Sequence, residues 1–412
     1  MDHFHTDFAA NAKSVCTVTI IRRIVSRMKT LYVHVGQPKT GTTALQVFCL
    51  KNRKVLNKKG YEYPFFEYKY KHINRRRNGH FLVGIVRDED GNRLKEEEAR
   101  LMKEGLALVE DAFRKYDHVV LSDERLWHAS KGPLFAYWNV LKEHSEKHGY
   151  VVKMIVYLRR QDVFATSWRN QMIKNGFEGA YGQYRWKEWL EKDTPGIVLD
   201  YYWLLEKIAA VIGKENVKVR IYDRAWLERD GGNIYTDFLD AIDLKWDDSF
   251  VIEPEDPNPS LTLNLQEIKR IVNNTPEYEG DDGDLFGKAI RRCAAGKNPD
   301  YPCSMFSVEE LKAFLAKYEE SNNKIAREYL HREGPLFDMT IKELDKWTEN
   351  NPYMYEDIIR YFTQVALLQQ ERIDKDIRKL KEGVAANKAR LNKITDMAKH
   401  PMKAAKHIIR KK

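Results

Sequence analysis

Residues 36–43 place one lysine, two glycines and three hydroxyl side chains next to one another, in the order Gly-Gln-Pro-Lys-Thr-Gly-Thr-Thr. An apolar run, 29–35, precedes this segment, and a helical pattern, 42–52, follows it. The free backbone amides and the helix dipole of such a turn attract anions. Gly41 allows close backbone approach, and Lys39 adds a positive charge. The segment therefore predicts a phosphate or sulfate site, with further donors from Thr40, Thr42 and Thr43.

The order of these residues narrows the kind of site. A nucleoside-triphosphatase loop carries its lysine after the second glycine, whereas Lys39 precedes Gly41 here. The string resembles instead the 5′-phosphosulfate-binding loop of the sulfotransferase family, P-K-[ST]-G-T-T, and matches it at all six positions. The resemblance implies that Lys39 contacts the transferring oxygens of 3′-phosphoadenosine 5′-phosphosulfate (PAPS). It implies that the donor is bound by Pro38, Lys39, Thr40, Gly41, Thr42 and Thr43.

A second group of donors follows another apolar run, 151–158. Arg159 stands directly after this run, and Ser167 lies eight positions later in a helical pattern. A guanidinium offers a planar fork of donors that suits a phosphate monoester, and a hydroxyl adds a neutral donor. The sulfotransferase family binds the 3′-phosphate of its donor with an arginine and a serine at this spacing. The resemblance therefore implies that Arg159 and Ser167 do so in this chain.

Sulfuryl transfer also needs a base that removes the proton of the acceptor, and it has no obligatory metal. Members of the family use His or Glu. His80 is the leading candidate, because it opens an apolar segment after a polar loop and histidine titrates near neutrality. Glu124 competes with it, because it follows a predicted strand at a sheet end where ligands gather, in a Ser-x-Glu pattern that resembles bacterial relatives. Glu62 and His34 are weaker candidates, and a core role is favoured for His34.

Strand and helix patterns alternate through the first part of the chain. Buried strands are predicted at 29–35, 118–121, 151–158 and 217–222, and helices at 94–116, 134–148 and 201–212. This order predicts an α/β fold with an open, mainly parallel sheet flanked by helices, similar to P-loop proteins.

Beyond Pro254 the pattern becomes helical, which predicts a C-terminal annex with helices at 260–273, 307–329 and 354–381. We expect a disordered leader at 1–27, a sulfotransferase domain at 28–345 and a helical basic extension at 346–412.

The net charge of +9 is concentrated near the C-terminus, where residues 376–412 contain twelve Lys and Arg and three Asp and Glu. The rest of the chain is near neutral, which argues against nucleic-acid binding as the main function. Apolar residues recur at helical steps in this basic region, among them Leu391, Ile394 and Ala398. The pattern predicts an amphipathic helix that contacts an anionic membrane surface, with a solvated helix as the alternative.

Cysteine usage and hydropathy indicate the setting of the protein. The four cysteines do not have the spacing of a metal site, and they are too few to stabilise a secreted domain of this size by disulfide bonds. We therefore expect a reducing, cytoplasmic environment. No apolar run approaches the roughly 20 residues of a membrane-spanning helix. The cysteines are Cys16, Cys49, Cys293 and Cys303.

The acceptor stays open at this point. Residues 61–77 mix aromatic and basic side chains, which suits a saccharide cleft or a solvated loop. A glycan, a lipid-linked saccharide, a small alcohol and an amine all fit. Ala44 stands where soluble small-molecule sulfotransferases carry a Trp that stacks on adenine, so those contacts are not carried over. A P-loop nucleotide kinase and a non-catalytic nucleotide-binding module are the alternative functions.

Overall fold

The computed structural model describes residues 28–176, 183–192, 197–253, 260–276, 285–295 and 302–399. The predicted leader and the chain from residue 400 onward lie outside these residues. Among the described residues the chain forms two compact units. The first contains residues 28–169, 185–253 and 304–345, and the second contains 170–184, 260–303 and 346–399. The second unit thus includes residues 260–303, which we had grouped with the first domain.

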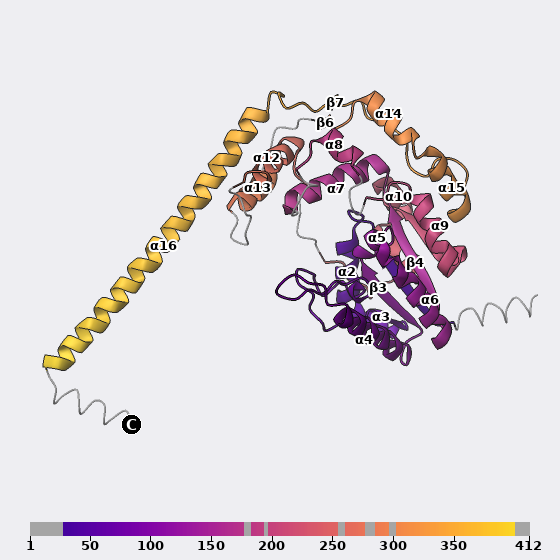
Figure 1. Cartoon of the computed structure of the whole chain (residues 1–412), viewed down its shortest axis with the longest axis horizontal. Coiled ribbons are helices and arrows are strands. Elements are labelled where there is room, and N and C mark those ends of the chain that lie inside the picture. Colours follow the sequence, from indigo (N-terminus) through magenta and orange to yellow (C-terminus); the bar gives the residue numbers. More distant parts are fainter. Residues whose placement is uncertain are drawn as a thin grey trace, which may run out of the picture. The chain divides into compact units, whose positions relative to one another are not determined.

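A five-stranded parallel sheet forms the centre of the first unit (Figure 1). Its strands lie in the order β2 (Tyr61–Glu62), β3 (His118–Asp123), β1 (Thr30–Val35), β4 (Val151–Leu158) and β5 (Val217–Ile221). Parallel register places Thr30 opposite both His118 and Val151, and Val35 opposite Asp123. The α/β fold predicted from the alternating pattern is confirmed. The edge strand β2 has two residues, which is too short for a periodic signal.

Side chains of β1 alternate between two hydrophobic clusters, because successive residues of a strand point to opposite faces. Leu31, Val33 and Val35 pack in the first cluster and Tyr32 in the second. The first cluster is covered by α4 (Lys95–Phe113), α5 (Arg125–Ala129), α6 (Tyr137–His148), α9 (Tyr201–Ile212) and α15 (Glu319–Tyr329). The second is covered by α2 (Thr42–Lys51), α3 (Arg53–Lys58) and α11 (Ile234–Ala241).

Further helices complete the connections. They are η1 (His80–Leu82), η2 (Pro133–Ala136), α7 (Gln161–Asn175), α8 (Trp186–Glu191), η3 (Lys214–Asn216), α10 (Arg224–Glu228), η4 (Arg229–Gly231) and α14 (Val308–Ala316). The helix predicted at 307–329 is two helices, α14 and α15, which are separated at Lys317 and Tyr318. The two-residue strands β6 (Cys303–Ser304) and β7 (Asp345–Lys346) fall where the sequence passes between the units.

The second unit contains α12 (Leu263–Asn273), α13 (Leu285–Ala295) and the 46-residue helix α16 (Met354–Lys399). Leu265, Ile290 and Tyr361 form the centre of its core. We predicted a helix at 354–381 and an amphipathic helix in the basic region that follows it. In the structure they are one helix that runs through Gly383, whose cost in an otherwise favourable helix is about 1 kcal/mol. Within the described part of the chain, no helix is both long and apolar enough to cross a membrane.

His34 lies in β1 and is fully buried, as expected for a core histidine. Its Nδ1 atom lies 2.9 Å from the hydroxyl of Ser122, and its ring contacts Tyr157 and Phe238 edge-on. Burial lowers the pKa of His34 from 6.5 to about 4. The neutral ring is therefore part of the folded core.

We predict that His34→Gln flattens the acid side of the stability profile. In the unfolded chain His34 binds a proton below about pH 6.5, whereas in the fold it does so only near pH 4. As the pH falls through this window, the free energy of unfolding of the wild type should therefore decrease by on the order of 3 kcal/mol more than that of the variant. Urea unfolding at several pH values measures this difference, and parallel profiles would contradict it.

Candidate active site

The carboxyl ends of four parallel strands bring the candidate residues to one edge of the sheet. The loop after β1 begins at Gly36, β3 ends at Asp123, and Arg159 and Tyr222 follow β4 and β5. In open α/β sheets, ligands bind at this edge. The site predicted from separate motifs therefore converges at the place where such folds bind ligands.

Backbone geometry shapes the loop before α2. Gly41, the residue that caps α2, has a φ of 73°, and a Cβ atom there would lie 2.4 Å from Ile234 and 3.1 Å from Tyr222. Lys39 has a φ of 68°, a conformation that costs a non-glycine residue about 1 to 2 kcal/mol. No side chain caps the first turn of α2, so its amides are not satisfied by a capping group. This is the arrangement of an anion-binding helix start.

Arg159 holds the loop from the neighbouring strand. Its backbone amide donates to Gln37 Oε1 at 2.9 Å, and its guanidinium donates to the carbonyl of Lys39 at 3.0 Å. The hydroxyl of Tyr201 donates to the Arg159 carbonyl at 2.8 Å, and the guanidinium lies 5.6 Å from the Tyr222 ring centre. The structure thus brings the Arg159 guanidinium to the backbone of Lys39.

The hydroxyl side chains of the loop differ in their partners. Thr40 is buried and donates to the Gln37 carbonyl at 2.6 Å, so it braces the loop. Thr42 is also buried, but its hydroxyl has no hydrogen-bond partner among the described residues. Thr43 is exposed. Ser167 is half-buried in α7, and it makes no hydrogen bond with Arg159, although both belong to the described residues.

The buried carboxylate of Asp123, at the end of β3, contacts two side chains from the connection between β2 and β3. Asp123 has no exposed surface, and its two oxygens accept hydrogen bonds from the Arg77 guanidinium at 2.8 and 2.9 Å. His80 Nδ1 lies 3.0 Å from Asp123 Oδ2. Burial alone would raise the pKa of Asp123, but His80 and Arg77 outweigh it and hold the pKa well below the usual range. A charged carboxylate therefore orients the buried His80 ring through Nδ1.

Glu124 lies between this cluster and the loop. Its carboxylate accepts a hydrogen bond from Arg77 at 3.2 Å, and its side chain is 41% exposed. Desolvation raises the pKa of Glu124, while Arg77 and Lys39 oppose the rise. The pKa of Lys39 is lowered by burial and by the nearby Arg159 charge, and Glu124 counteracts this. The structure therefore couples both candidate bases to the loop, through Arg77 and Lys39.

Sequence reasoning missed Arg77 and Asp123 as a pair. They are 46 residues apart, and only the sheet topology brings them together. A carboxylate directly at the end of a buried strand was the available signal for Asp123. The mixed segment 61–77 also contributes less to an open cleft than its composition indicated, because Tyr63, Phe66 and Tyr70 are buried in the core.

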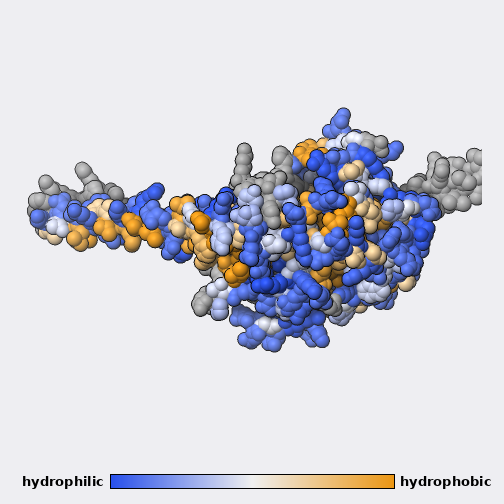
Figure 2. Space-filling model, turned by 90° about the horizontal axis from the view of Figure 1, so that it is seen from above, coloured by the Kyte–Doolittle hydropathy of each residue, from blue (hydrophilic) through white to orange (hydrophobic). Residues whose placement is uncertain are grey.

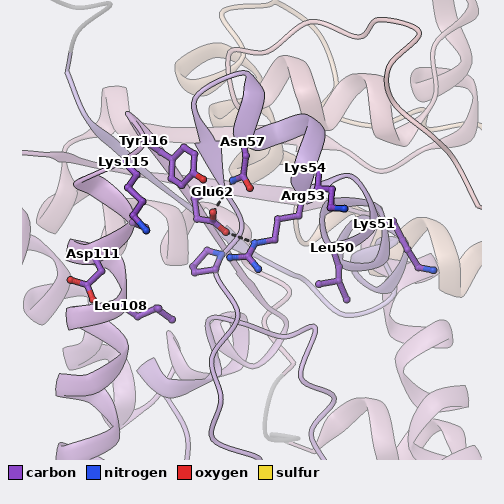
Figure 3. A pocket seen from close by; sticks show the side chains of 12 residues that line it. Leu50, Lys51, Arg53, Lys54, Asn57, Glu62, Leu108, Asp111, Lys115 and Tyr116 are labelled. Atoms are coloured by element: carbon purple, nitrogen blue, oxygen red, sulfur yellow. Dashed lines mark hydrogen bonds and ion pairs between the residues drawn. The ribbon is translucent and has the colours of Figure 1, made fainter.

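A pocket of about 790 Å³ lies at the edge strand β2, away from the Lys39 loop (Figure 3). Glu62 points into it and binds Arg53 at 2.5 Å and Asn57 at 2.7 Å. A carboxylate held by these two donors is a structural ion pair. The position of Glu62, remote from the loop, argues against the role of transfer base that we considered for it.

Comparisons with known proteins yield limited likeness. No family model matches the chain. An uncharacterized protein of Archaeoglobus fulgidus is 26% identical over 231 residues, or 55% of this chain and 55% of the relative, so the chain spans about half the length of the curated relative that it matches. The crystal structure of a sulfotransferase from Alicyclobacillus acidocaldarius has a TM-score of 0.32 and 15% identity, over 55% of this chain and 86% of that chain.

We predict that two matched threonine variants differ in their effect on the free energy of unfolding. Thr40→Val removes a buried hydrogen bond and should lower the free energy of unfolding by about 1 to 3 kcal/mol. Thr42→Val removes a buried hydroxyl that has no partner in the described part of the chain, so it should leave the free energy of unfolding unchanged or raise it. Urea unfolding of both variants tests this contrast. Equal losses would mean that Thr42 has a structural role.

Proposed function

We propose that this protein is a sulfotransferase that moves the sulfuryl group of PAPS to a hydroxyl or amine of an acceptor, preferably a saccharide. One observation carries the proposal: the loop that matches the phosphosulfate pattern at six positions has an uncapped helix start, the buried, unpartnered hydroxyl of Thr42, and Arg159 bound to its backbone. A hydroxyl buried without a partner costs stability, and a bound anion would satisfy it.

The donor would use the loop and Arg159 for its two phosphate groups. The amides that begin α2, together with Thr42 and Thr43, would hold the 5′-phosphate. Arg159 would supply positive charge for the 3′-phosphate, with Ser167 from α7. Arg suits this task because its planar donors match phosphate oxygens. These donors are neutral or positively charged and would bind the phosphates directly. We therefore expect no magnesium ion in this scheme.

In the transfer step, the acceptor oxygen or nitrogen attacks the sulfur as the bond from sulfur to the 5′-phosphate oxygen breaks. The products are the sulfated acceptor and adenosine 3′,5′-bisphosphate. Lys39 would stabilise the negative charge that develops on the departing phosphate, as positioned charges do in phosphoryl transfer. The strained backbone of Lys39 fixes the direction in which its side chain leaves the loop.

His80 would accept the proton of the acceptor at Nε2, because Nδ1 faces Asp123. This arrangement follows the logic of a base that is oriented by a buried carboxylate. Asp123 and Arg77 are positioning residues in this scheme. Glu124 would hold Arg77 and balance the charge of Lys39.

We predict that adenosine 3′,5′-bisphosphate raises the melting temperature of the wild type, because a ligand that binds the folded state stabilises it. Thr42→Val should reduce this shift. Lys39→Ala should keep much of the shift but lower the transfer rate from PAPS to a panel of sugars by about 100-fold or more. Thermal shift and detection of the released nucleotide measure the two effects.

Two controls make this test decisive. Stabilisation by ATP with magnesium, without a response to the bisphosphate, would contradict the sulfotransferase proposal and favour a kinase. His80→Asn should lower the transfer rate by about 100-fold or more, while Glu124→Gln should have a smaller effect. Similar mild losses in both variants would contradict the assignment of His80 as the base.

A further inference from the structure

Three side chains that can bind a metal meet at the opposite end of the sheet from the Lys39 loop. Glu110 lies near the end of α4, and His144 and His148 lie in the last turns of α6. Both helices end just before the strands β3 and β4 begin. One ligand atom from each of the three residues lies within 4.8 Å of the others.

The distances match those of a zinc site. His144 Nε2 lies 3.0 Å from Glu110 Oε1, and His148 Nε2 lies 3.6 Å from the same oxygen. Zinc binds nitrogen and carboxylate oxygen at about 2.0 to 2.2 Å in tetrahedral geometry, which separates its ligands by about 3.3 Å. The two imidazole rings stack at 4.2 Å with an angle of 17° between their planes, so both present Nε2 to one side.

The chemistry of the cluster favours a cation at its centre. Two Nε2 atoms face a single carboxylate oxygen, and without a metal each ring can donate an Nε2–H to it, as His144 does at 3.0 Å. One metal ion can replace these protons and bind all three groups at once. In addition, His144 Nδ1 lies 2.8 Å from the hydroxyl of Tyr150, the outer contact that orients a metal-binding histidine.

We propose that Glu110, His144 and His148 bind one Zn²⁺ ion, with solvent in the fourth position. Two nitrogen ligands and one carboxylate oxygen suit zinc better than magnesium or calcium. The site is separate from the transfer chemistry, for which we expect no metal. Because its ligands come from two helices, the ion would connect α4 to α6 on one face of the sheet.

To test the site, the tag-free full chain is stripped with a chelator, dialysed against Zn²⁺ and analysed by elemental mass spectrometry. The wild type should retain one equivalent and melt at a higher temperature with zinc than without it. His148→Ala should lower the zinc affinity by more than about tenfold and remove the shift. His148 is the exposed member of the cluster, so the metal-free variant should fold normally.

His72→Ala, at an exposed loop position, is the matched control and should bind zinc like the wild type. Glu110→Gln provides a second test through another ligand. Absence of bound zinc in the wild type, or equal binding by His148→Ala, would overturn the proposal and leave the cluster as an ion pair.

The apolar stripe of α16 carries a second, independent inference. From residue 373 to 398, one face of α16 follows steps of four and three residues. Its large apolar members are 44 to 69% exposed, and Figure 2 shows hydrophobic side chains gathered along one side of this helix. We call these eight positions the seam: Ile373, Ile377, Leu380, Val384, Asn387, Leu391, Ile394 and Ala398.

The period of the seam indicates that its partner is another helix in a coiled coil. A strict repeat of 3.5 residues is typical of a left-handed coiled coil, whereas a helix that lies on a membrane needs a broader apolar face with a period of 3.6. The seam spans more than three heptads, the length expected of a stable coiled coil. We propose that the seam pairs with the seam of a second copy of this chain.

Charge and polarity favour a parallel, in-register pair. In this orientation Asn387 meets its own counterpart, so its amide group has a hydrogen-bonding partner inside the interface. Asp376 flanks the seam at a position that faces Lys381 of the second copy, and the two charges attract. An antiparallel pair would instead place Asn387 against apolar residues.

We predict that the full chain is a dimer in sedimentation analysis at micromolar concentration. Ile377→Lys with Val384→Lys should convert it to a monomer. The matched control adds the same two charges outside the seam, as Ala385→Lys with Ala389→Lys, and should stay dimeric. A monomeric wild type would overturn the pairing, and loss of binding to anionic vesicles by the seam variant alone would then indicate a membrane contact.

Discussion

The buried carboxylate of Asp123 is the interaction on which the rest of the candidate site depends. A charge without exposed surface is tolerated only where it is paired, and Asp123 has Arg77, His80 and the backbone amide of Arg125 as partners. Because Asp123 is the last residue of β3 and pairs in register with Val35, its position is fixed by the central strands. The candidate base His80 lies in a connection outside the sheet, but its ring is oriented by the contact with this strand residue.

Local features were predictable from the sequence. The Lys39 loop and Arg159 were found because each depends on a few adjacent residues at the end of an apolar run, and such signals persist in any fold of this class. The boundaries of β4 and α9 agree with the predicted ranges for the same reason. The continuity of α16 was missed, since Gly383 interrupts the pattern between the two predicted helical segments, whereas the helix tolerates one glycine.

Contacts between distant residues were not predictable. Asp123 pairs with His80 and Arg77, which precede it by 43 and 46 residues. Glu110 and His144 are 34 residues apart and meet only because their two helices pack together. The sequence held a partial signal for that cluster, because His144 and His148 are one helical turn apart. The carboxylate that joins them lies on another helix, so only tertiary structure reveals the third ligand.

The exposed half of α16 has a consequence for how the protein would meet its acceptor. Two chains paired through their seams carry two candidate active sites in one dimer. On an acceptor with many repeated units, one site can stay bound while the other releases its product, which raises the effective concentration of the free site without any new contact. Under the proposed function, the pairing of two chains through α16 would thus make a weak affinity for one sugar unit sufficient for residence on a long polymer.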